Sequence, residues 1–406
     1  MECDYIKKLK TPAMPNEPSV RVLRSVGDLE SIRQVWESWP GNRDSEMNSY
    51  LKFIESNRAT VRPHIVVVER EGRPDAILVG RIDRGQINGR IGYIDLKLPA
   101  RVLYFVYGAL RGNPSSENCD LVLRSVIQSL SAKEADVAYM NFINEDSALF
   151  RLSIEKPGLL CRDYVRIRQP HFAARLPNSA EEFYRGLSSN SRWQAKTKQK
   201  KLIKDFAGNV KIRCFREVTE LDALVEDVEQ VAKTSYQRGL GVGFIDSPEM
   251  RERLRLKAER GWLRGYVLYV AGRPRAFWIG DMNAGSFGSD YLAYDAELGK
   301  YSPGMCLILK VIEGFYENER EKVTGVDFAT GHAQYKEVLS NQNWMEASVH
   351  IFAPSMRGLC LNAFRSTVEG TDKVIKKILF RTRLLQRIKK LWRERAKPKD
   401  AVQARA

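Results

Sequence analysis

One order of elements occurs twice along the chain, and this repeat restricts the fold more than any other feature. Gly72-Arg73-Pro74-Asp75-Ala76 in the first half matches Gly272-Arg273-Pro274-Arg275-Ala276 in the second half. Each run lies between two apolar segments, the second of which ends in glycine, at Gly80 and Gly280. Glycine and proline at this spacing predict a tight turn between antiparallel strands. We infer that the chain contains two copies of one architecture.

The segments around the two turns follow the same plan. In the first half, helices are expected over 28–39, 45–56 and 116–132, and strands over 64–70, 76–81, 87–98, 102–107 and 137–142. In the second half, helices are expected over 180–187, from 192 onward, 217–236, 248–259 and 304–319, and strands over 210–215, 266–270, 276–281, 286–294, 323–328 and 347–352. Antiparallel strands that precede a helical crossover are typical of an α+β sandwich.

A chain of 406 residues is long enough for two domains. We predict an N-terminal tail over 1–19, a first domain over 20–175, a second over 176–356, and a basic amphipathic helix and tail over 357–406. Pro170 and Pro177 place the linker near 168–179.

Composition excludes several classes of protein. The 43% hydrophobic content argues against wholesale disorder. No run approaches 18 apolar residues, and residues 1–15 have no apolar core of a secretory signal. Six dispersed cysteines without a CxxC pair, with only four histidines, argue against a disulfide framework or a zinc knuckle. We therefore expect a cytoplasmic protein without a metal site.

The net charge of +16 is concentrated in two runs. Residues 373–397 hold eleven Lys and Arg against one acid, and Ile388 and Trp392 lie on the apolar side of this amphipathic helix. Such a helix is a solvated tail, a ligand for an anionic membrane surface, or a nucleic-acid contact. The second run, Arg192 to Lys204, has few interleaved aromatic residues, and we expect a solvated helix face there.

The loop before the 304–319 helix has the chemistry of a phosphate site. Ser302 is a good N-cap and Pro303 suits the first helical position. The first turn lacks an acid that would neutralise the helix dipole, and Gly304 allows a ligand close to the backbone amides. Simple helix capping is the alternative. The matching helix of the first half carries two acids in its opening turn, Glu117 and Asp120, so we expect any phosphate-bearing cofactor in the second half.

Candidate reacting groups follow the 323–328 strand. Asp327 is a candidate base, His332 a candidate base near neutral pH, and Tyr335 a candidate acid for a leaving thiolate. The alternatives are a turn cap for Asp327, a turn residue for His332, simple packing for Tyr335, and a solvated side chain for Lys336.

Together these features resemble the GNAT-type acyltransferases with two tandem GNAT folds. The second half, over 180–354, is most similar to the cellulose-biosynthesis acetyltransferase (CelD-type) family. The resemblance rests on these motifs: Ser188-Ser189-Asn190-Ser191-Arg192, Ala293-Tyr294-Asp295, Tyr301-Ser302-Pro303-Gly304, Asp327-Phe328, Gly331 and Tyr335-Lys336.

The resemblance implies two mixed, mostly antiparallel sheets flanked by helices, with the cofactor in the second. It implies that Lys300–Gly304 holds the coenzyme A pyrophosphate and that a strand amide near Tyr291–Tyr294 polarises the thioester carbonyl. The residues assigned to acetyl-CoA, or another acyl-CoA, are Tyr294, Lys300, Tyr301, Ser302, Gly304 and Met305. Those assigned to the acceptor are Tyr291, Lys336 and Arg192, and those assigned to catalysis are Asp327, His332 and Tyr335.

The expected activity is direct acetyl transfer to a hydroxyl or amine of a sugar or polysaccharide precursor, at the inner membrane face through residues 373–397. The resemblance implies direct transfer. A covalent route would need an activated cysteine, and Cys306 has no histidine nearby in sequence. One alternative is a FemAB-type transferase that uses aminoacyl-tRNA, with residues 192–204 on the RNA. Those enzymes usually insert a long helical arm, whereas this basic helix is short. The other alternative is a non-catalytic, membrane-associated scaffold.

Overall fold

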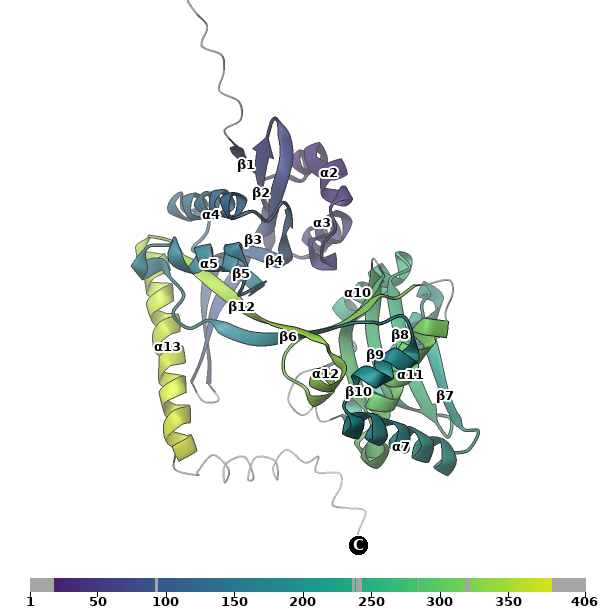
Figure 1. Ribbon diagram of the computed structural model, residues 1–406. Helices are drawn as coiled ribbons and strands as arrows, with labels where there is room; N and C mark the ends of the chain where they lie inside the picture. The colour runs from purple at the N-terminus through teal and green to yellow at the C-terminus, as the bar shows by residue number, and fades with distance from the viewer. Residues whose placement is uncertain are drawn as a thin grey trace, which may run out of the picture. The chain divides into compact units, whose positions relative to one another are not determined.

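The structure is a computed structural model that describes residues 18–91, 94–235, 238, 243–283, 285–317 and 322–381. It divides into two compact units. Unit 1 comprises Met1–Arg168 and Glu346–Lys389, and unit 2 comprises Gln169–Met345 and Lys390–Ala406. Each unit has a mixed sheet covered by helices (Figure 1), which confirms the α+β expectation.

The sheet of unit 1 has the order β1-β2-β3-β4-β5-β12. Its strands are β1 Ser19–Leu23, β2 Thr60–Arg70, β3 Arg73–Ile91, β4 Ile94–Gly112, β5 Val137–Asn144 and β12 Gln342–Phe352. Its helices are α1 Val26–Leu29, α2 Arg33–Ser38, α3 Met47–Ser56, α4 Ser116–Ser131, α5 Ala148–Glu155 and α13 Met356–Arg381. Neighbouring strands are antiparallel except for the parallel pair β4 and β5.

The sheet of unit 2 has the order β6-β11-β10-β9-β8-β7. Its strands are β6 Ile167–Arg175, β7 Val210–Phe215, β8 Leu263–Val270, β9 Arg273–Asn283, β10 Ser286–Tyr294 and β11 Gly325–Thr330. Its helices are α6 Ala180–Gly186, α7 Ser189–Asp205, α8 Leu221–Thr234, α10 Pro248–Glu259, α11 Pro303–Glu317 and α12 Gln334–Leu339. The parallel pair is β10 and β11.

The two repeated turns have the same backbone conformation. Glu71 and Gly72 have φ of 54° and 73°, and Ala271 and Gly272 have φ of 50° and 74°. Positive φ at two successive residues matches the right-handed twist of a hairpin, which explains the glycine at the second position. The predicted repeat is therefore a repeated β-hairpin, β2–β3 in unit 1 and β8–β9 in unit 2.

The core of unit 2 lies on both faces of its sheet. Along β9, Trp278 packs in the cluster that contains α11 residues, whereas Phe277 and Ile279 pack in the cluster that contains α8 residues. Successive strand residues point to opposite faces, so α11 and α8 cover different faces. All three side chains are fully buried, and burial of each contributes about 1.5–3 kcal/mol.

One prediction about local structure is wrong. The expected strand over 87–98 is a hairpin instead, because Ile91 of β3 pairs with Ile94 of β4. The expected linker region, 168–179, contains the division between the units at Arg168 and Gln169, and most of strand β6 lies in it. Pro170 is part of that strand, and its carbonyl accepts a hydrogen bond from the N–H of Gly331 at 2.9 Å.

The last strand also differs from the expected domain plan, in which residues up to 356 belong to the second domain. Residues 346–352 of β12 pair with β5 and belong to unit 1. The strand-forming pattern was visible in the sequence, but pairing partners are a long-range property that residue pattern does not encode.

The C-terminal helix α13 is fastened to unit 1 by a buried ion pair. Arg365 donates to the Asp163 carboxylate at 2.5 Å, and His350 Nδ1 lies 3.2 Å from the same carboxylate. Asp163 is fully buried, and these partners hold its pKa down at about 2 against the opposing effect of burial. The predicted basic amphipathic segment 373–397 lies outside the residues whose side chains are described. None of the helices in the described ranges is long and apolar enough to span a membrane.

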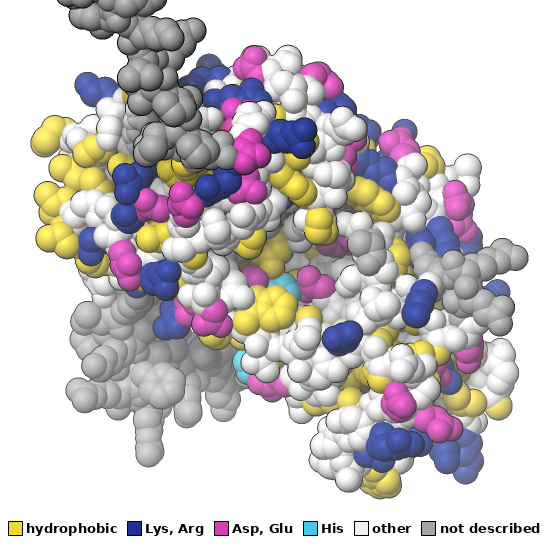
Figure 2. Space-filling view, turned by 45° about the horizontal axis from the view of Figure 1, so that its top comes forward, with side chains coloured by type: hydrophobic (Ala, Val, Ile, Leu, Met, Phe, Trp, Pro, Cys, Tyr) yellow, Lys and Arg dark blue, Asp and Glu magenta, His cyan; other side chains and the backbone are white. Residues whose placement is uncertain are grey.

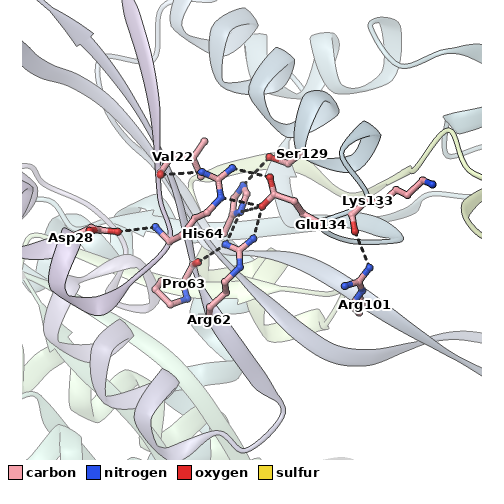
Figure 3. Close-up of polar contacts among 10 residues, drawn as sticks. Val22, Asp28, Arg62, Pro63, His64, Arg101, Ser129, Lys133 and Glu134 are labelled. Atoms are coloured by element: carbon pink, nitrogen blue, oxygen red, sulfur yellow. Dashed lines mark hydrogen bonds and ion pairs between the residues drawn. The ribbon is translucent and has the colours of Figure 1, made fainter.

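A second polar cluster of unit 1 joins its first strands to the end of α4 (Figure 3). Glu134 accepts hydrogen bonds from Arg24, at 2.8 Å, and from Arg62. His64 is fully buried, with Nε2 3.3 Å from the hydroxyl of Ser129. Hydrogen bonds from the two arginines lower the pKa of Glu134 to about 2, and burial lowers the pKa of His64 to about 4. The cluster is a structural tie between elements far apart in sequence.

Candidate active site

The largest cavity described in unit 2 has a volume of about 920 Å³. It opens where β10 and β11 part: the parallel register ends at the pair Gly288–Asp327, and both strands line the cavity beyond that pair. Helix α7, the start of α11 and the loop that leads into α12 line the rest. Its volume suits an extended organic ligand.

The N-terminus of α11 lies at this cavity. Ser302 has φ of 50°, and its carbonyl accepts the N–H of Cys306 at 3.0 Å. Pro303 has no N–H, so the first-turn donors beside the cavity are the backbone amides of Gly304 and Met305. The first turn contains no acidic residue, as the sequence indicated.

A lysine from a different helix adds positive charge there. Lys198 of α7 donates from Nζ to the Ser302 hydroxyl at 2.8 Å, and both residues line the cavity. An ammonium group, a hydroxyl and two amides at a helix N-terminus form a favourable environment for a phosphate oxygen. Residue pattern alone does not distinguish Lys198, because it is one of six basic residues on the same helix.

The predicted cofactor residues divide into two groups. Tyr294, Ser302, Gly304 and Met305 line the cavity. Gly304 has little free space, since a Cβ built there would lie 3.2 Å from Cδ1 of Tyr294. Tyr301 and Lys300 are not among the lining residues.

Tyr301 is a core residue. It is 3% exposed, and its hydroxyl donates to the Asp205 carboxylate at 2.8 Å. Lys300 is exposed, with its ammonium 4.9 Å from the centre of the Tyr301 ring. Tyr301 therefore supports the loop from behind, and the loop presents Ser302 and Gly304 to the cavity.

Asp327 forms a pair with a histidine that sequence reasoning missed. His171 Nε2 of β6 lies 2.7 Å from Oδ1 of Asp327. Val326 and Phe328 pack in the cluster on the α11 face, so Asp327 points to the opposite face of the sheet. The same Oδ1 accepts the N–H of Ala329 at 2.7 Å, so the predicted capping role is also present.

The imidazole of His171 is rigidly held. It is 1% exposed, and its ring stacks on Trp344 with centroids 4.3 Å apart and an interplanar angle of 10°. The Asp327 side chain is 39% exposed. The pair thus presents one accessible carboxylate oriented by a buried imidazole, an arrangement suited to proton transfer.

The other predicted catalytic residues lie on the loop that follows β11. His332 is 69% exposed in its side chain, with Nε2 2.7 Å from the Glu337 carboxylate. Tyr335 is half-buried, with its ring 6.0 Å from that of Phe328. Both line the cavity. The structure brings Asp327, His332 and Tyr335 to one end of β11, and the buried His171 orients the carboxylate of Asp327.

Lys336 is a buried lysine at the same loop. It is 8% exposed and donates from Nζ to the carbonyls of Ala329 and Thr330 at 3.2 and 2.7 Å. Burial lowers its pKa to about 8, and the nearby charge of Asp327 opposes that effect. Lys336 therefore holds the turn in which Ala329 has φ of 60° and Gly331 has φ of 94°.

The predicted acceptor residues Tyr291 and Arg192 differ in position. Tyr291 lines the cavity and packs edge-on against Phe244, with centroids 5.8 Å apart. Arg192 is not among the lining residues, and it donates to the carbonyls of Arg185 and Leu187 at 3.1 Å. Arg192 therefore caps the C-terminus of α6.

An ionic cluster borders the cavity at a β-bulge. The register of β10 with β9 shifts between Ser289 and Tyr291, and Asp290 between them lines the cavity. The Asp290 carboxylate pairs with Lys257 of α10, which also lies 3.0 Å from Asp281. The sequence offered no signal for this cluster, because its members come from three elements. Within the described ranges, no group of three His, Cys, Asp or Glu side chains is placed to hold a metal ion.

Cys306 lines the cavity but is a poor nucleophile there. Burial raises the pKa of its thiol to about 11, although Lys198 and Lys310 oppose the effect. Its sulfur donates to the Tyr301 carbonyl at 3.3 Å. A thiol held protonated at neutral pH does not favour a covalent intermediate.

Part of unit 2 is similar to a known protein family. Residues 189–337 match the model of the acetyltransferase (GNAT) domain. No curated protein matches the sequence. Solved structures similar to this chain include FemX, at 10% identity and a TM-score of 0.51, over 82% of this chain and 97% of that chain. L-PGS from Bacillus licheniformis is also similar, at 12% identity and a TM-score of 0.46, over 85% of this chain and 98% of that chain.

Residues 189–337 thus form a GNAT acetyltransferase domain. This domain supports the assignment of the protein as an acyltransferase. The likeness to FemX shows a shared two-unit fold.

Proposed function

We propose that the protein transfers an acetyl group from acetyl-CoA to a hydroxyl or amine of a saccharide acceptor, as the resemblance to the CelD-type family suggests. The supporting observation is the single cavity that contains both the α11 N-terminus and the parted ends of β10 and β11. The first suits a phosphate and the second suits a thioester beside an acceptor.

The residues present fit coenzyme A. The amides of Gly304 and Met305, the Ser302 hydroxyl and Lys198 would hold phosphate oxygens, and the cavity continues from them to Tyr291 and Asp290 on β10. When bound, acetyl-CoA supplies an activated acyl group as a thioester. A backbone amide of β10 near Tyr291–Tyr294 would polarise the thioester carbonyl.

Two side chains of unit 2 would then carry out the two proton transfers of the reaction. Asp327, oriented by His171, would accept the proton of the attacking hydroxyl or amine, and Tyr335 would donate a proton to the leaving thiolate. Transfer would be direct, since the raised pKa of Cys306 keeps that thiol protonated. His332, exposed and paired with Glu337, would contact the acceptor at the rim.

Gly304 offers a direct test of acetyl-CoA binding. Gly304→Glu and Gly304→Gln add side chains of the same size at a position packed against Tyr294, but only glutamate adds a negative charge beside the phosphate groups. Isothermal titration calorimetry at about 0.15 M salt screens nonspecific anion binding to the basic chain. We expect one saturable site in the wild-type protein, weakened by at least tenfold more in Gly304→Glu than in Gly304→Gln.

Three results would contradict parts of the proposal. Absence of saturable binding in the folded wild-type protein would exclude acetyl-CoA as the donor, and the donor to test next would be aminoacyl-tRNA. Equal weakening in the two variants would show that the α11 N-terminus senses size and not phosphate charge. A wild-type protein that binds acetyl-CoA but transfers acetyl to no saccharide would remove the saccharide acceptor.

A further inference from the structure

Helix α7 presents a basic strip on its outward face. Lys196, Lys200 and Lys204 recur at four-residue spacing, and all three are exposed. Trp193, 65% exposed, lies at the N-terminal end of the strip, and Ile203, 50% exposed, lies at its C-terminal end. Tryptophan is enriched at protein contacts, so its exposure beside the lysines is unusual for a solvated helix face.

The positive charge of the strip is not neutralised within unit 2. Across the described ranges, no salt bridge joins Lys196, Lys200, Lys201 or Lys204 to an acid. The one acid of α7, Asp205, accepts the hydroxyl of Tyr301. On the face of the molecule shown in Figure 2, Lys and Arg side chains are interspersed with Asp and Glu.

The same helix forms a wall of the candidate active site. Asn190, Gln194 and Lys198 line the cavity. They lie one to three positions along the helix from the outward residues Trp193, Lys196 and Lys200, which line a separate shallow groove. A partner on the outward face of α7 would therefore lie beside the cavity entrance. An acyl group on a flexible arm of that partner could reach β10 and β11.

The start of α11 suits the phosphate of such an arm. Pro303 lacks an N–H, and the Cys306 N–H is already bonded to the Ser302 carbonyl, so the first turn offers the amides of Gly304 and Met305. These two amides, with Lys198 and Ser302, can donate to the oxygens of the phosphate that a phosphopantetheine arm shares with coenzyme A.

We propose that the outward face of α7 docks an acidic carrier protein, which delivers the acyl group as a thioester on a phosphopantetheine arm. This proposal rests on the proposed acyltransfer function and names the form of its donor. In the reaction the thioester C–S bond breaks and a C–O or C–N bond to the acceptor forms. The acceptor loses its proton to the base of the site, and the pantetheine thiolate regains one as it leaves.

The width of the strip favours a protein over RNA or a membrane. On the α6 and α11 side, the groove beside Lys196 is also lined by the acids Glu181, Glu313 and Glu317. The basic surface is therefore about one helix wide, and α7 is about 25 Å long. One acidic helix of a partner complements such a ridge. A nucleic-acid duplex or an anionic lipid surface is wider, so its negative charge would also face Glu181, Glu313 and Glu317 and be repelled.

The test compares two donors in the full-length protein. Acetyl transfer is measured from an acetylated holo acyl carrier protein and from free acetyl-CoA, and binding of the unacetylated carrier is measured by biolayer interferometry. The charge reversal Lys196→Glu/Lys200→Glu should raise the KM for the carrier by at least about tenfold, since like charges across an interface repel. The KM for free acetyl-CoA should change less than about threefold, because neither lysine lines the cavity.

The matched control is Lys233→Glu/Arg255→Glu, which changes the net charge equally on the two helices of the opposite face, α8 and α10. It should leave the KM for the carrier unchanged. The carrier proposal would be overturned if the carrier failed to bind, or if Lys196→Glu/Lys200→Glu lowered activity equally with both donors. Activity of the wild-type protein with free acetyl-CoA would still support the acyltransfer function in that case. If bulk tRNA, or vesicles rich in anionic phospholipid, bound more tightly than the carrier and the Lys196→Glu/Lys200→Glu variant lost that binding, α7 would be assigned to that ligand instead.

Discussion

The two units of this chain begin their crossover helices in opposite ways. In unit 1, side chains cover the start of α4. Asn118 is fully buried and donates to Asp75 at 2.7 Å, and Glu117 pairs with Arg70 at 2.7 Å. In unit 2, the start of α11 has no acid, and its first-turn residues line the cavity with Lys198 beside them. The same fold position is thus closed in one unit and open in the other.

The paired strands differ in the same sense. The parallel register of unit 1 ends at Phe105–Met140, two buried apolar residues, whereas that of unit 2 ends at Gly288–Asp327. The hairpin, the strand order and the crossover helix are shared. A handful of side chains at the helix start and the last strand pair therefore determines which copy has the chemistry of an active site.

The largest expected effect comes from removing the negative charge of the unit 2 pair. Asp327→Asn keeps the hydrogen bond to the N–H of Ala329 but removes the negative charge beside His171. Loss of a general base lowers kcat by about 10²–10⁴-fold. Steady-state acetyl transfer measures this, with acetyl-CoA binding as the control for folding.

His171→Asn distinguishes the positioning residue from the base. This substitution should lower kcat less than Asp327→Asn does and leave acetyl-CoA affinity unchanged. An Asp327→Asn variant with full activity would remove Asp327 from the catalytic role. The base would then be sought at His332.

A smaller effect is expected from pH. Lys336 is charged below its pKa of about 8 and neutral above it, and its ammonium holds the carbonyls of Ala329 and Thr330. Wild-type kcat/KM should therefore decline as pH rises through about 8. In Lys336→Met the group does not titrate, so the ratio of wild-type to variant activity should be highest below pH 8 and fall above it. A ratio that is constant from pH 6.5 to 9.5 would show that this charge does not support the site.

The smallest effect on activity is expected in unit 1. Glu134→Gln removes the carboxylate that Arg24 and Arg62 share (Figure 3), at a cost of about 1–2 kcal/mol in the free energy of unfolding. The pKa of Glu134 is lowered from 4.5 to about 2 in the folded state, so its contribution is present above pH 4.5 and is lost as pH falls toward 2.

Differential scanning calorimetry should therefore show a lower Tm for Glu134→Gln at pH 7 and a shrinking difference below pH 4.5. Acetyl-CoA affinity should stay within twofold of wild type. A large loss of affinity would mean that unit 1 takes part in donor binding, and the contrast between the units would fail.

Much of this architecture was predictable from local sequence patterns. The strands over 210–215 and 286–294 and the helix over 248–259 agree with the structure residue for residue, because their boundaries carry capping or turn residues. The repeated hairpin and the acid-free start of α11 were also visible in the sequence. These features depend on neighbours close in the chain.

The missing parts depend on residues distant in the chain. His171 was overlooked because Pro170 made its strand resemble a linker, and its partner Asp327 is 156 positions away. Tyr301 and Lys300 were assigned to the cofactor because they precede Ser302, but the 3-10 turn over 296–301 directs Tyr301 into the core. Sequence spacing shows that a residue is near a loop, and only the fold shows which side of the loop it occupies.

The origin of strand β12 has a consequence for biosynthesis. Its residues 346–352 complete the unit 1 sheet at β5, yet the ribosome makes them only after all of residues 169–345. A nascent chain that has emerged up to Arg168 therefore exposes the edge of β5, and unit 1 must wait for its last strand while unit 2 is translated. Since domains generally fold as they emerge, the later-encoded copy is able to fold first. During that delay, β5 is the edge that a chaperone would need to protect from pairing with another chain.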